Sequence, residues 1–244
     1  FKSSGTKGTR SKHYISDIKL YVECFEKIFK SNYGNIKGKI ILGLLPSYVE
    51  QGYSSLVFMV DHLIKLSEQT KSGFYLNNYK KLYDLINNVN EKKIILFGVS
   101  YALLDFIEKY NLSSKNLTVI ETGGMKGRRK EITRDELHKR LKIGFGTESI
   151  HSEYGMTELL SQAYLQGDLF TPPKWLKPLV RDTTDPLHSK LEGKGALNFI
   201  DLANLHSCSF IATDDLGTVN KTGGFNVAGR IDHTQIRGCN LLVL

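Results

Sequence analysis

Apolar positions along the chain form two alternating patterns. Short, almost wholly apolar runs are typical of strands buried on both faces of a sheet. They cover residues 39–45, 94–99 and 117–120. Between these runs, helices are indicated by apolar residues at every third or fourth position or by a capping residue. The helical stretches cover residues 14–29, 54–66, 78–89, 101–110 and 133–141. Strands alternating with helices predict an α/β fold with a mostly parallel sheet and flanking helices.

Hydroxyl residues mark the starts of three of these helices. Ser54 or Ser55 precedes the second helix, and Ser100 precedes the fourth. A serine oxygen at such a position can accept a hydrogen bond from a free backbone amide of the first turn. Thr133 and Glu136 form a capping box that opens the last helix.

The pattern changes after about residue 168. Thr171-Pro172-Pro173 breaks the chain, and from residue 179 onward short β-like segments are separated by Gly and Asp turns. These segments cover residues 179–181, 196–201, 209–213 and 225–227. We therefore predict an α/β domain over residues 1–174 and a smaller β-rich subdomain over residues 175–244.

Composition and charge exclude some classes of protein. The chain has 244 residues, of which 41% are hydrophobic and 24% charged, as in ordinary globular proteins. No apolar run reaches the roughly 18 residues of a membrane-spanning helix, so we expect no membrane span. The net charge of +8 is compatible with ATP, an anionic acyl substrate, nucleic acid or no specific ligand. The basic run at residues 126–130 lacks interleaved aromatic residues, so we expect no nucleic-acid partner.

Cysteine usage indicates a reducing compartment. Cys24, Cys208 and Cys239 are odd in number, widely spaced and without a CxxC pair, which disfavours a disulfide scaffold or a zinc site. We therefore predict a cytoplasmic protein. Cys24 lies off the apolar stripe of the first helix, and we interpret Cys24 and Cys208 as structural thiols.

The first motif stands almost at the start of the chain. Ser3-Ser4-Gly5-Thr6-Lys7-Gly8-Thr9 combines glycines, hydroxyls and a cation. Glycine lets the backbone approach a phosphate closely, and successive amides can cradle an anion. The spacing differs from the P-loop signature, and a flexible polar terminus is the alternative interpretation. Because a phosphate loop normally follows a strand, we expect a segment to precede Phe1 in the complete protein.

Three further motifs fall where predicted strands end, the edge at which parallel sheets bind ligands. They are Pro46-Ser47-Tyr48, Glu121-Thr122-Gly123-Gly124 and Tyr154-Gly155-Met156-Thr157-Glu158. Two more follow in the β-rich part, Thr213-Asp214-Asp215 and Gly229-Arg230-Ile231-Asp232.

In this order the motifs resemble those of the adenylate-forming superfamily of acyl-CoA synthetases and firefly-type luciferases. The narrower resemblance is to the acyl-protein synthetase (LuxE-like) family of bacterial fatty-acid reductase systems. Residues 121–129, 152–159 and 236–241 carry that narrower resemblance, and the whole resemblance covers essentially all 244 residues. It implies a ligase that joins a carboxylic acid to AMP, with ATP and Mg²⁺ as cofactors.

Carried over position by position, the resemblance implies a role for each motif residue. The first loop would hold the β- and γ-phosphates through Ser3, Ser4, Gly5, Thr6, Lys7 and Gly8. Tyr154 and Gly155 would line the adenine, as would Gly123 and Gly124, which would also border the acyl pocket. Thr157 would bond the α-phosphate, Glu158 would hold Mg²⁺, Asp215 would bond the ribose, and Arg230 would reach the ribose or a phosphate.

Simpler interpretations stay open for three of these residues. Glu158 is also an acid near the start of a helix beginning at Thr157, where the helix dipole favours a carboxylate. Asp215 is also an ordinary turn residue. Arg230 is also a surface ion-pair residue.

The last residues of the chain bear on the second implied step, the transfer of the acyl group to a thiol. The superfamily continues past a hinge into a lid domain with a catalytic lysine, and we expect no lid before Leu244. Adenylation would then be slow, use Lys7 or Lys126, or need a partner chain. The LuxE-like family carries the acyl group on a cysteine near its carboxyl end, which implies that Cys239 forms the thioester. The cation of Arg237 beside it would raise the thiolate fraction.

The resemblance thus implies ATP-dependent activation of a carboxylic acid, of the long-chain fatty acid type, and transfer to Cys239. An acyl-CoA reductase-like or other acyl-acceptor protein would receive the acyl group. Two alternatives stay open: a ligase of the phenylacetate–CoA type that uses coenzyme A, and a nucleotide-binding module without catalysis.

Overall fold

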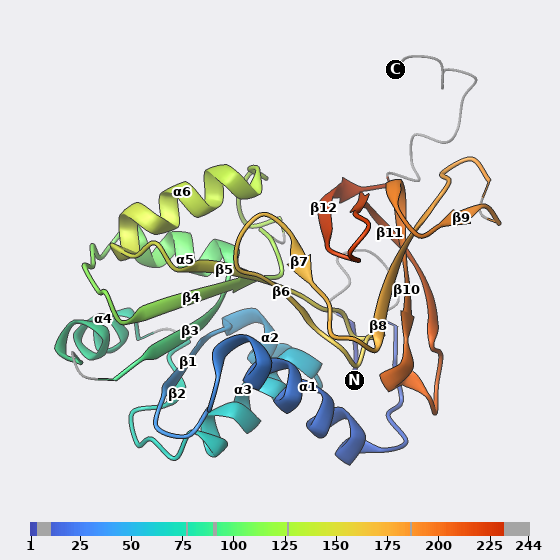
Figure 1. Cartoon of the computed structure of the whole chain (residues 1–244). Coiled ribbons are helices and arrows are strands. Elements are labelled where there is room, and N and C mark those ends of the chain that lie inside the picture. The colour runs from blue at the N-terminus through green and yellow to red at the C-terminus, as the bar shows by residue number, and fades with distance from the viewer. Residues whose placement is uncertain (4–10, 77, 90–91, 126, 186, 232–244) are drawn as a thin grey trace.

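A computed structural model describes residues 1–3, 11–76, 78–89, 92–125, 127–185 and 187–231. Within this part of the chain, twelve strands form one sheet in the order β2-β1-β3-β4-β5-β6-β7-β12-β11-β10-β8-β9 (Figure 1). The first five strands in that order run parallel, and every later neighbour pairs antiparallel. The predicted α/β class is confirmed.

The parallel strands lie between two layers of helices. The strands are β1 (Ile40–Leu44), β2 (Gly73–Phe74), β3 (Ile94–Val99), β4 (Leu117–Thr122) and β5 (Ile150–Tyr154). On one face lie α1 (Ile18–Tyr33), α2 (Pro46–Gln51) and α3 (Ser55–Leu66). On the other lie α4 (Tyr79–Asn88), α5 (Ser100–Ile107) and α6 (Arg134–Phe145). The layers arise because β1 and β3 are apolar on both faces and need cover on each.

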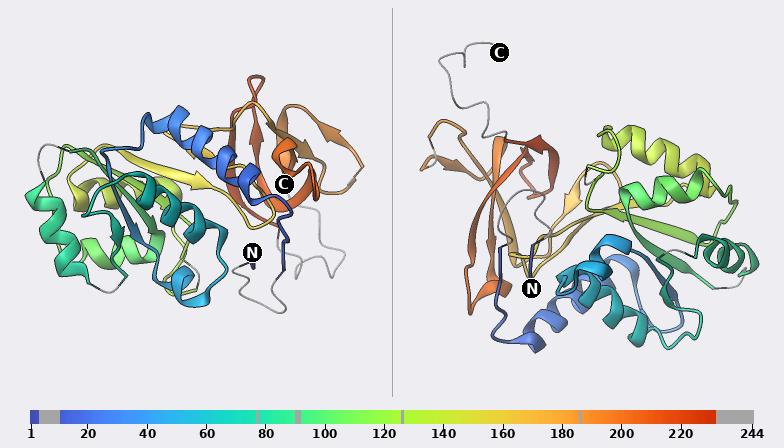
Figure 2. Two further views of the ribbon diagram at one scale, coloured as in Figure 1. Left: turned by 90° about the horizontal axis from the view of Figure 1, so that it is seen from below. Right: turned by 180° about the vertical axis from the view of Figure 1, so that it is seen from behind.

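The antiparallel strands extend the same sheet. They are β6 (Ala163–Leu165), β7 (Phe170–Thr171), β8 (Leu176–Arg181), β9 (Ser189–Lys190), β10 (Gly193–Asp201), β11 (Phe210–Val219) and β12 (Phe225–Arg230), with a short 3-10 helix at Leu202–Asn204. Figure 2 shows the start of the chain running between α1 and these strands. The β-rich texture predicted after residue 168 is confirmed, whereas the division at residue 175 stays a prediction.

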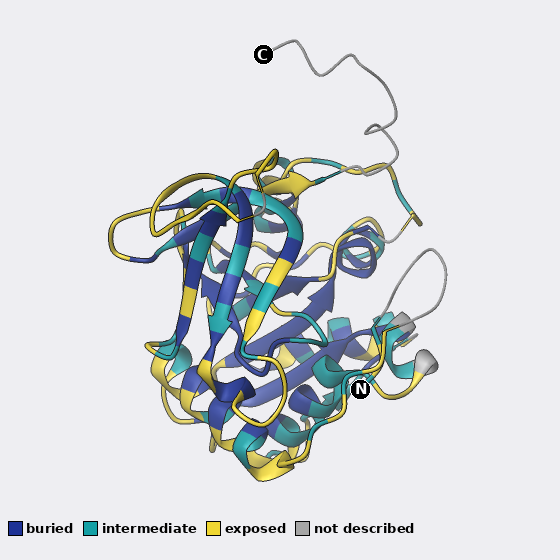
Figure 3. Cartoon of the chain, turned by 90° about the vertical axis from the view of Figure 1, so that its right-hand side faces the viewer, coloured by how far each residue is buried: buried dark blue, intermediate teal, exposed yellow. Residues whose placement is uncertain are grey.

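Three clusters of apolar side chains form the core. One packs α4, α5 and α6 onto the sheet and includes Phe106, Phe145 and Leu96. A second packs α1 and α3 onto the opposite face. A third fills the antiparallel part around Phe199 and Phe225. Buried residues therefore run along the central strands, and exposed ones gather in the connecting loops (Figure 3).

Local capping explains several helix starts. Ser54 accepts a bond from the Val57 amide at 3.3 Å, and Thr133 accepts one from the Glu136 amide at 3.2 Å, as predicted. Ser100 is different, because it is the first residue of α5 and its hydroxyl donates to Glu121 Oε2 at 2.9 Å. The prediction that Ser100 caps this helix was therefore wrong.

The first helix also differs from its prediction. It begins at Ile18 instead of residue 14, because the Asp17 carboxylate accepts bonds from the Lys19 and Leu20 amides. Its buried face includes Tyr21 and Cys24, so placing Cys24 off the apolar stripe was wrong. None of the described helices is long and apolar enough to cross a membrane.

Candidate active site

A cavity of about 1380 Å³ opens where the parallel strands end and the antiparallel strands begin. Every candidate site residue in the described ranges lines it. These residues are Ser3, Gly123, Gly124, Tyr154, Gly155, Thr157, Glu158, Asp215 and Arg230. The remaining candidates, Ser4, Gly5, Thr6, Lys7, Gly8 and Cys239, lie outside the described residues. Residues up to 227 positions apart in the sequence thus share one cavity.

The base of the first loop meets the Tyr154–Glu158 turn. Ser3 and Ser11 pair through the Ser3 amide and the Ser11 carbonyl, and the Ser11 amide donates to Ser3 Oγ at 2.9 Å. The Ser11 hydroxyl then donates to Glu158 Oε1 at 2.5 Å. The two ends of the loop are therefore held beside the carboxylate of Glu158. Sequence reasoning missed Ser11, which stands outside the motif.

The Glu158 turn is anchored from behind by buried polar groups. Thr157 and Glu158 lie in a turn, so the interpretation of Glu158 as an acid at a helix start was wrong. The Glu158 carbonyl accepts from Asn204 Nδ2 at 2.7 Å. Two residues further on, the fully buried Asp201 carboxylate accepts from the Leu160 and Ser161 amides at 3.0 and 3.1 Å. These bonds fix the backbone that presents Glu158 to the cavity.

A chain of polar contacts links β5 to the antiparallel strands. The Tyr154 hydroxyl donates to Asp215 Oδ2 at 2.8 Å, and Arg230 Nε lies 3.1 Å from Asp215 Oδ1. Burial, followed by the charge of Asp215, raises the pKa of Tyr154, so its hydroxyl stays a donor. Phe199 and Phe225 pack against the Tyr154 ring. Arg230 is largely exposed beyond this pair.

Two glycines bring the backbone to the cavity surface. Gly123 and Gly124 have φ values of +75° and +63°, in the left-handed region that favours glycine. A Cβ at Gly123 would collide with the Tyr48 hydroxyl, whereas Gly124 faces open space. The corner after β4 therefore offers a stretch of bare backbone against which a flat ligand can lie.

Two carboxylates, the buried Glu121 and the half-buried Glu153, lie near this corner. Glu121 accepts from Ser100 Oγ at 2.9 Å and Ser152 Oγ at 2.6 Å, and His138 Nε2 lies 3.6 Å away. Burial raises the pKa of Glu121, but the nearby His138 and the bonds from the serines outweigh it and hold the pKa below its ordinary value. Burial raises the pKa of Glu153 to about 7, helped by the charge of Glu121 and opposed by a bond from Thr122.

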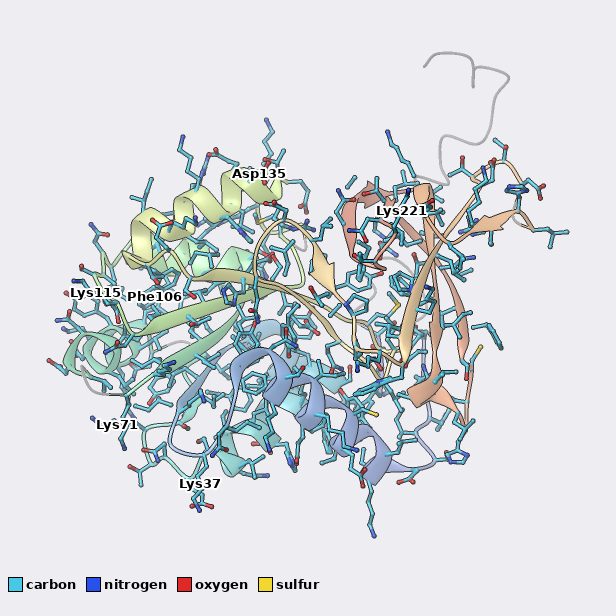
Figure 4. All side chains as sticks on the ribbon, viewed as in Figure 1. Lys37, Lys71, Phe106, Lys115, Asp135 and Lys221 are labelled. Carbon is cyan, nitrogen blue, oxygen red and sulfur yellow. The ribbon has the colours of Figure 1, made fainter. Side chains whose placement is uncertain are left out.

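The described wall of the cavity is acidic although the chain is basic. The basic side chains on it are Lys2, Arg134 and Arg230. The acidic ones are Glu121, Glu131, Asp135, Glu153, Glu158, Asp168, Asp214 and Asp215. Figure 4 places Asp135 at the end of α6 nearest the antiparallel strands. Sequence reasoning missed this concentration because the carboxylates come from elements far apart in the chain.

Comparison with known proteins identifies the fold. No family model and no curated protein matches the sequence. Among solved structures, ATP-bound MatB from Rhodopseudomonas palustris superposes with a TM-score of 0.64 at 15% identity, covering 94% of this chain and 47% of that one. The O-succinylbenzoate coenzyme A synthetase MenE from Bacillus subtilis, solved with ATP and magnesium, gives 0.63 at 18% identity, covering 94% and 49%.

A third solved structure widens the comparison. The luciferase-like enzyme of the mealworm Zophobas morio gives a TM-score of 0.63 at 16% identity, covering 96% of this chain and 57% of that one. The chain thus has the fold found in these three proteins. It spans about half the length of the MatB and MenE chains.

Proposed function

We propose that this chain carries the adenylation site of an ATP-dependent ligase that activates a carboxylic acid. The observation that carries the proposal is the hydrogen bond from Ser11 to Glu158. It joins the base of a glycine- and hydroxyl-rich loop to a carboxylate on the cavity wall. Polyphosphate and its cation need these two features side by side, because the loop would hold the phosphates and the carboxylate would hold the metal.

The residues present fit ATP and Mg²⁺. Mg²⁺ is usually held by one or two carboxylates together with phosphate oxygens and water. Among the described residues no group of three His, Cys, Asp or Glu side chains forms a dedicated metal cage, which agrees with a site completed by the nucleotide. Glu158 supplies the carboxylate, and Thr157 lies next to it to bond the α-phosphate. Bound Mg²⁺ would neutralise phosphate charge as pyrophosphate leaves.

The nucleoside would lie across the sheet edge. The bare backbone of Gly123 and Gly124 would face the adenine, with Tyr154 and Gly155 on its other side. Asp215, which Tyr154 and Arg230 already orient, would accept from the ribose hydroxyls. In the first step a carboxylate oxygen of the acid bonds to the α-phosphorus, and the bond to pyrophosphate breaks. The products are acyl-AMP and pyrophosphate.

The second step would pass the acyl group to a thiol. A thiolate attacks the acyl carbon and AMP leaves, which yields a thioester. Following the LuxE-like resemblance, we assign this thiol to Cys239, the acid to the long-chain fatty type and delivery to a reductase-like or other acceptor protein in the cytoplasm. Coenzyme A as the acceptor is the alternative, and the fold that this chain shares with the coenzyme A synthetase MenE favours it.

Pyrophosphate exchange and intact-protein mass test the two steps separately. The complete gene product would be incubated with Mg-ATP and a panel of free acids. We expect acid-dependent exchange in the wild type and in Cys239→Ala, and a fall of about 100-fold or more in Glu158→Ala. The matched control is Glu148→Gln, a change at an exposed carboxylate outside the cavity.

The mass measurement decides the acceptor. An ATP-dependent acyl adduct that hydroxylamine removes and Cys239→Ala abolishes supports the protein thioester. Exchange without an adduct points to coenzyme A. If neither exchange nor an adduct occurs with any acid, the adenylation proposal is wrong.

A further inference from the structure

The side chains of β5 alternate between two faces, and this separates Glu153 from the nucleotide side. Tyr154 points to the antiparallel strands and bonds Asp215. Successive residues of a strand point to opposite faces. Glu153 accordingly points the other way, where it accepts from Thr122 Oγ1 at 2.6 Å, on the face that α1 and α3 cover. Glu153 thus belongs to a region of the cavity away from the Asp215 contact.

Glu153 leaves one carboxylate oxygen available to the cavity. It is half-buried and lines the cavity. Among the described residues, Thr122 is the one donor to its carboxylate, and that bond goes to Oε2. Oε1 lies over Gly155, where a Cβ would collide with it. The absent side chain at Gly155 therefore keeps this oxygen uncovered.

Gln162 supplies a second acceptor, a buried and unpaired oxygen, in the wall of the same cavity. Its side chain is 4% exposed and lines the same cavity, and within the described residues its Oε1 has no hydrogen-bond partner. Its Nε2 donates to the Leu160 carbonyl at 3.3 Å, which sets the orientation of the amide. A Cβ at Gly155 would lie 3.6 Å from Gln162 Cγ, so both side chains flank this glycine.

The remaining neighbours on this wall supply apolar surface. Leu56 and Met59 of α3 and the ring of Tyr21 line the cavity on the α1 and α3 face. A plain saturated chain would bury two acceptor oxygens without partners, which is unfavourable in a dry site. A chain with an N–H or O–H group at the matching position would satisfy both and still pack against the apolar side chains.

We propose that Glu153 and Gln162 select an acid whose chain carries a hydrogen-bond donor, either a hydroxyl or an amino group. The proposal rests on the adenylation function and narrows its substrate class. The carboxylate of the acid would face the α-phosphate, and the donor group would reach Glu153 Oε1 and Gln162 Oε1. Unsubstituted acids of the same length become the poorer substrates.

Binding of stable adenylate mimics tests this selectivity without requiring turnover. The probes are N-acylsulfamoyl adenosines with chains of four to sixteen carbons, each unsubstituted, ω-hydroxylated or ω-aminated. At the matching length, calorimetry should show at least tenfold tighter binding of a donor-bearing probe to the complete protein. Glu153→Leu should abolish that preference and should still bind the unsubstituted probe with unchanged affinity. Glu148→Gln, far from the cavity, should preserve the preference.

Two further measurements distinguish a hydroxyl from an amino group as the donor, and one of them uses a variant of the same size as the wild type as a control for misfolding. Glu153→Gln keeps the size and an acceptor oxygen, so it should retain preference for the hydroxyl probe and lose preference for the ammonium probe. If the amine is the ligand, its affinity should rise between pH 6 and 8, as Glu153 ionises beside Glu121 and the Tyr21, Tyr33 and Tyr164 hydroxyls.

The outcomes distinguish this inference from the adenylation proposal. Equal or tighter binding of unsubstituted probes at every length overturns the inference and leaves adenylation standing. A preference that survives in Glu153→Leu overturns it as well. If none of the probes binds, the adenylation proposal itself fails.

Discussion

Replacing Asp201 tests how the fold holds the candidate site. Its carboxylate is fully buried and accepts four hydrogen bonds. Oδ2 accepts from the Leu160 and Ser161 amides, and Oδ1 accepts from the Ser161 hydroxyl and the Ala203 amide. An asparagine side chain has one acceptor oxygen, and an NH₂ group takes the place of the other. That NH₂ group would face two donors that bond to the carboxylate in the native protein.

The cost follows from which donors lose their acceptor. The cheaper orientation places the NH₂ group at the Oδ1 position, where the Ser161 hydroxyl can accept instead of donate. The Ala203 amide then stays unpaired, at about 1–3 kcal/mol, and the bonds to Oδ2 lose their charge assistance. We expect Asp201→Asn to lower the free energy of unfolding by about 2 kcal/mol, and Asp201→Ala by about 4 kcal/mol or more because all four donors lose their partner.

Urea unfolding followed by tryptophan fluorescence measures this cost. The single tryptophan, Trp175, donates its indole N–H to Ser161 Oγ at 2.9 Å and therefore reports on the same network. With a slope of about 2 kcal/mol per molar urea, the midpoint of Asp201→Asn should fall by about 1 M. Asp182→Asn is the matched control, because this exposed carboxylate also bonds a nearby amide and hydroxyl, of Thr184. An unchanged midpoint and slope in Asp201→Asn would refute the reasoning.

Three further predictions concern residues of the cavity wall. Gly123→Ala should destabilise the protein more than Gly124→Ala in urea unfolding, because both glycines have positive φ but only the first substitution also collides with a tyrosine hydroxyl; equal costs would contradict this. Tyr154→Phe should raise the KM for ATP in pyrophosphate exchange several-fold, since Asp215 loses its donor at 2.8 Å; an unchanged KM would count against a ribose role. Because the pKa of Glu153 is about 7 in the fold and 4.5 ordinarily, the folded protein keeps a proton that the unfolded chain releases. The free energy of unfolding should fall as pH rises from about 4.5 to about 7, by up to about 3 kcal/mol, and Glu153→Gln should remove that slope.

Elements with a strong local signal could be predicted from the sequence. The strands β1 and β3 and the helix cap at Thr133 depend on residues that are neighbours in the sequence, so local patterns predict them. The bounds of strand β5 were not predicted, because its residues include His151, Ser152 and Glu153, whose polar atoms find partners only in the folded protein. In the sequence alone, a polar segment of this kind cannot be distinguished from a loop, because its hydrogen-bond partners lie elsewhere in the chain.

The candidate site also has a part that could be predicted from the sequence and a part that could not. Its motif residues were predicted from their order, and the described ones meet in one cavity. Ser11 is separated from Glu158 by 147 positions, and Asp201 from Ser161 by 40. No local pattern marks either partner, because each hydrogen bond exists only after the sheet has brought the two segments together.

The described wall of the cavity and the chain as a whole have charges of opposite sign, and this links the binding of a charged ligand to the ions around it. The whole chain has a net charge of +8, which attracts a polyanion from a distance. The described wall opposes that anion at short range with eight carboxylates against three basic side chains. A divalent cation bound together with the polyanion would reduce that repulsion. Monovalent salt instead slows the encounter, because it screens the outer charge beyond about 10 Å at 0.1 M.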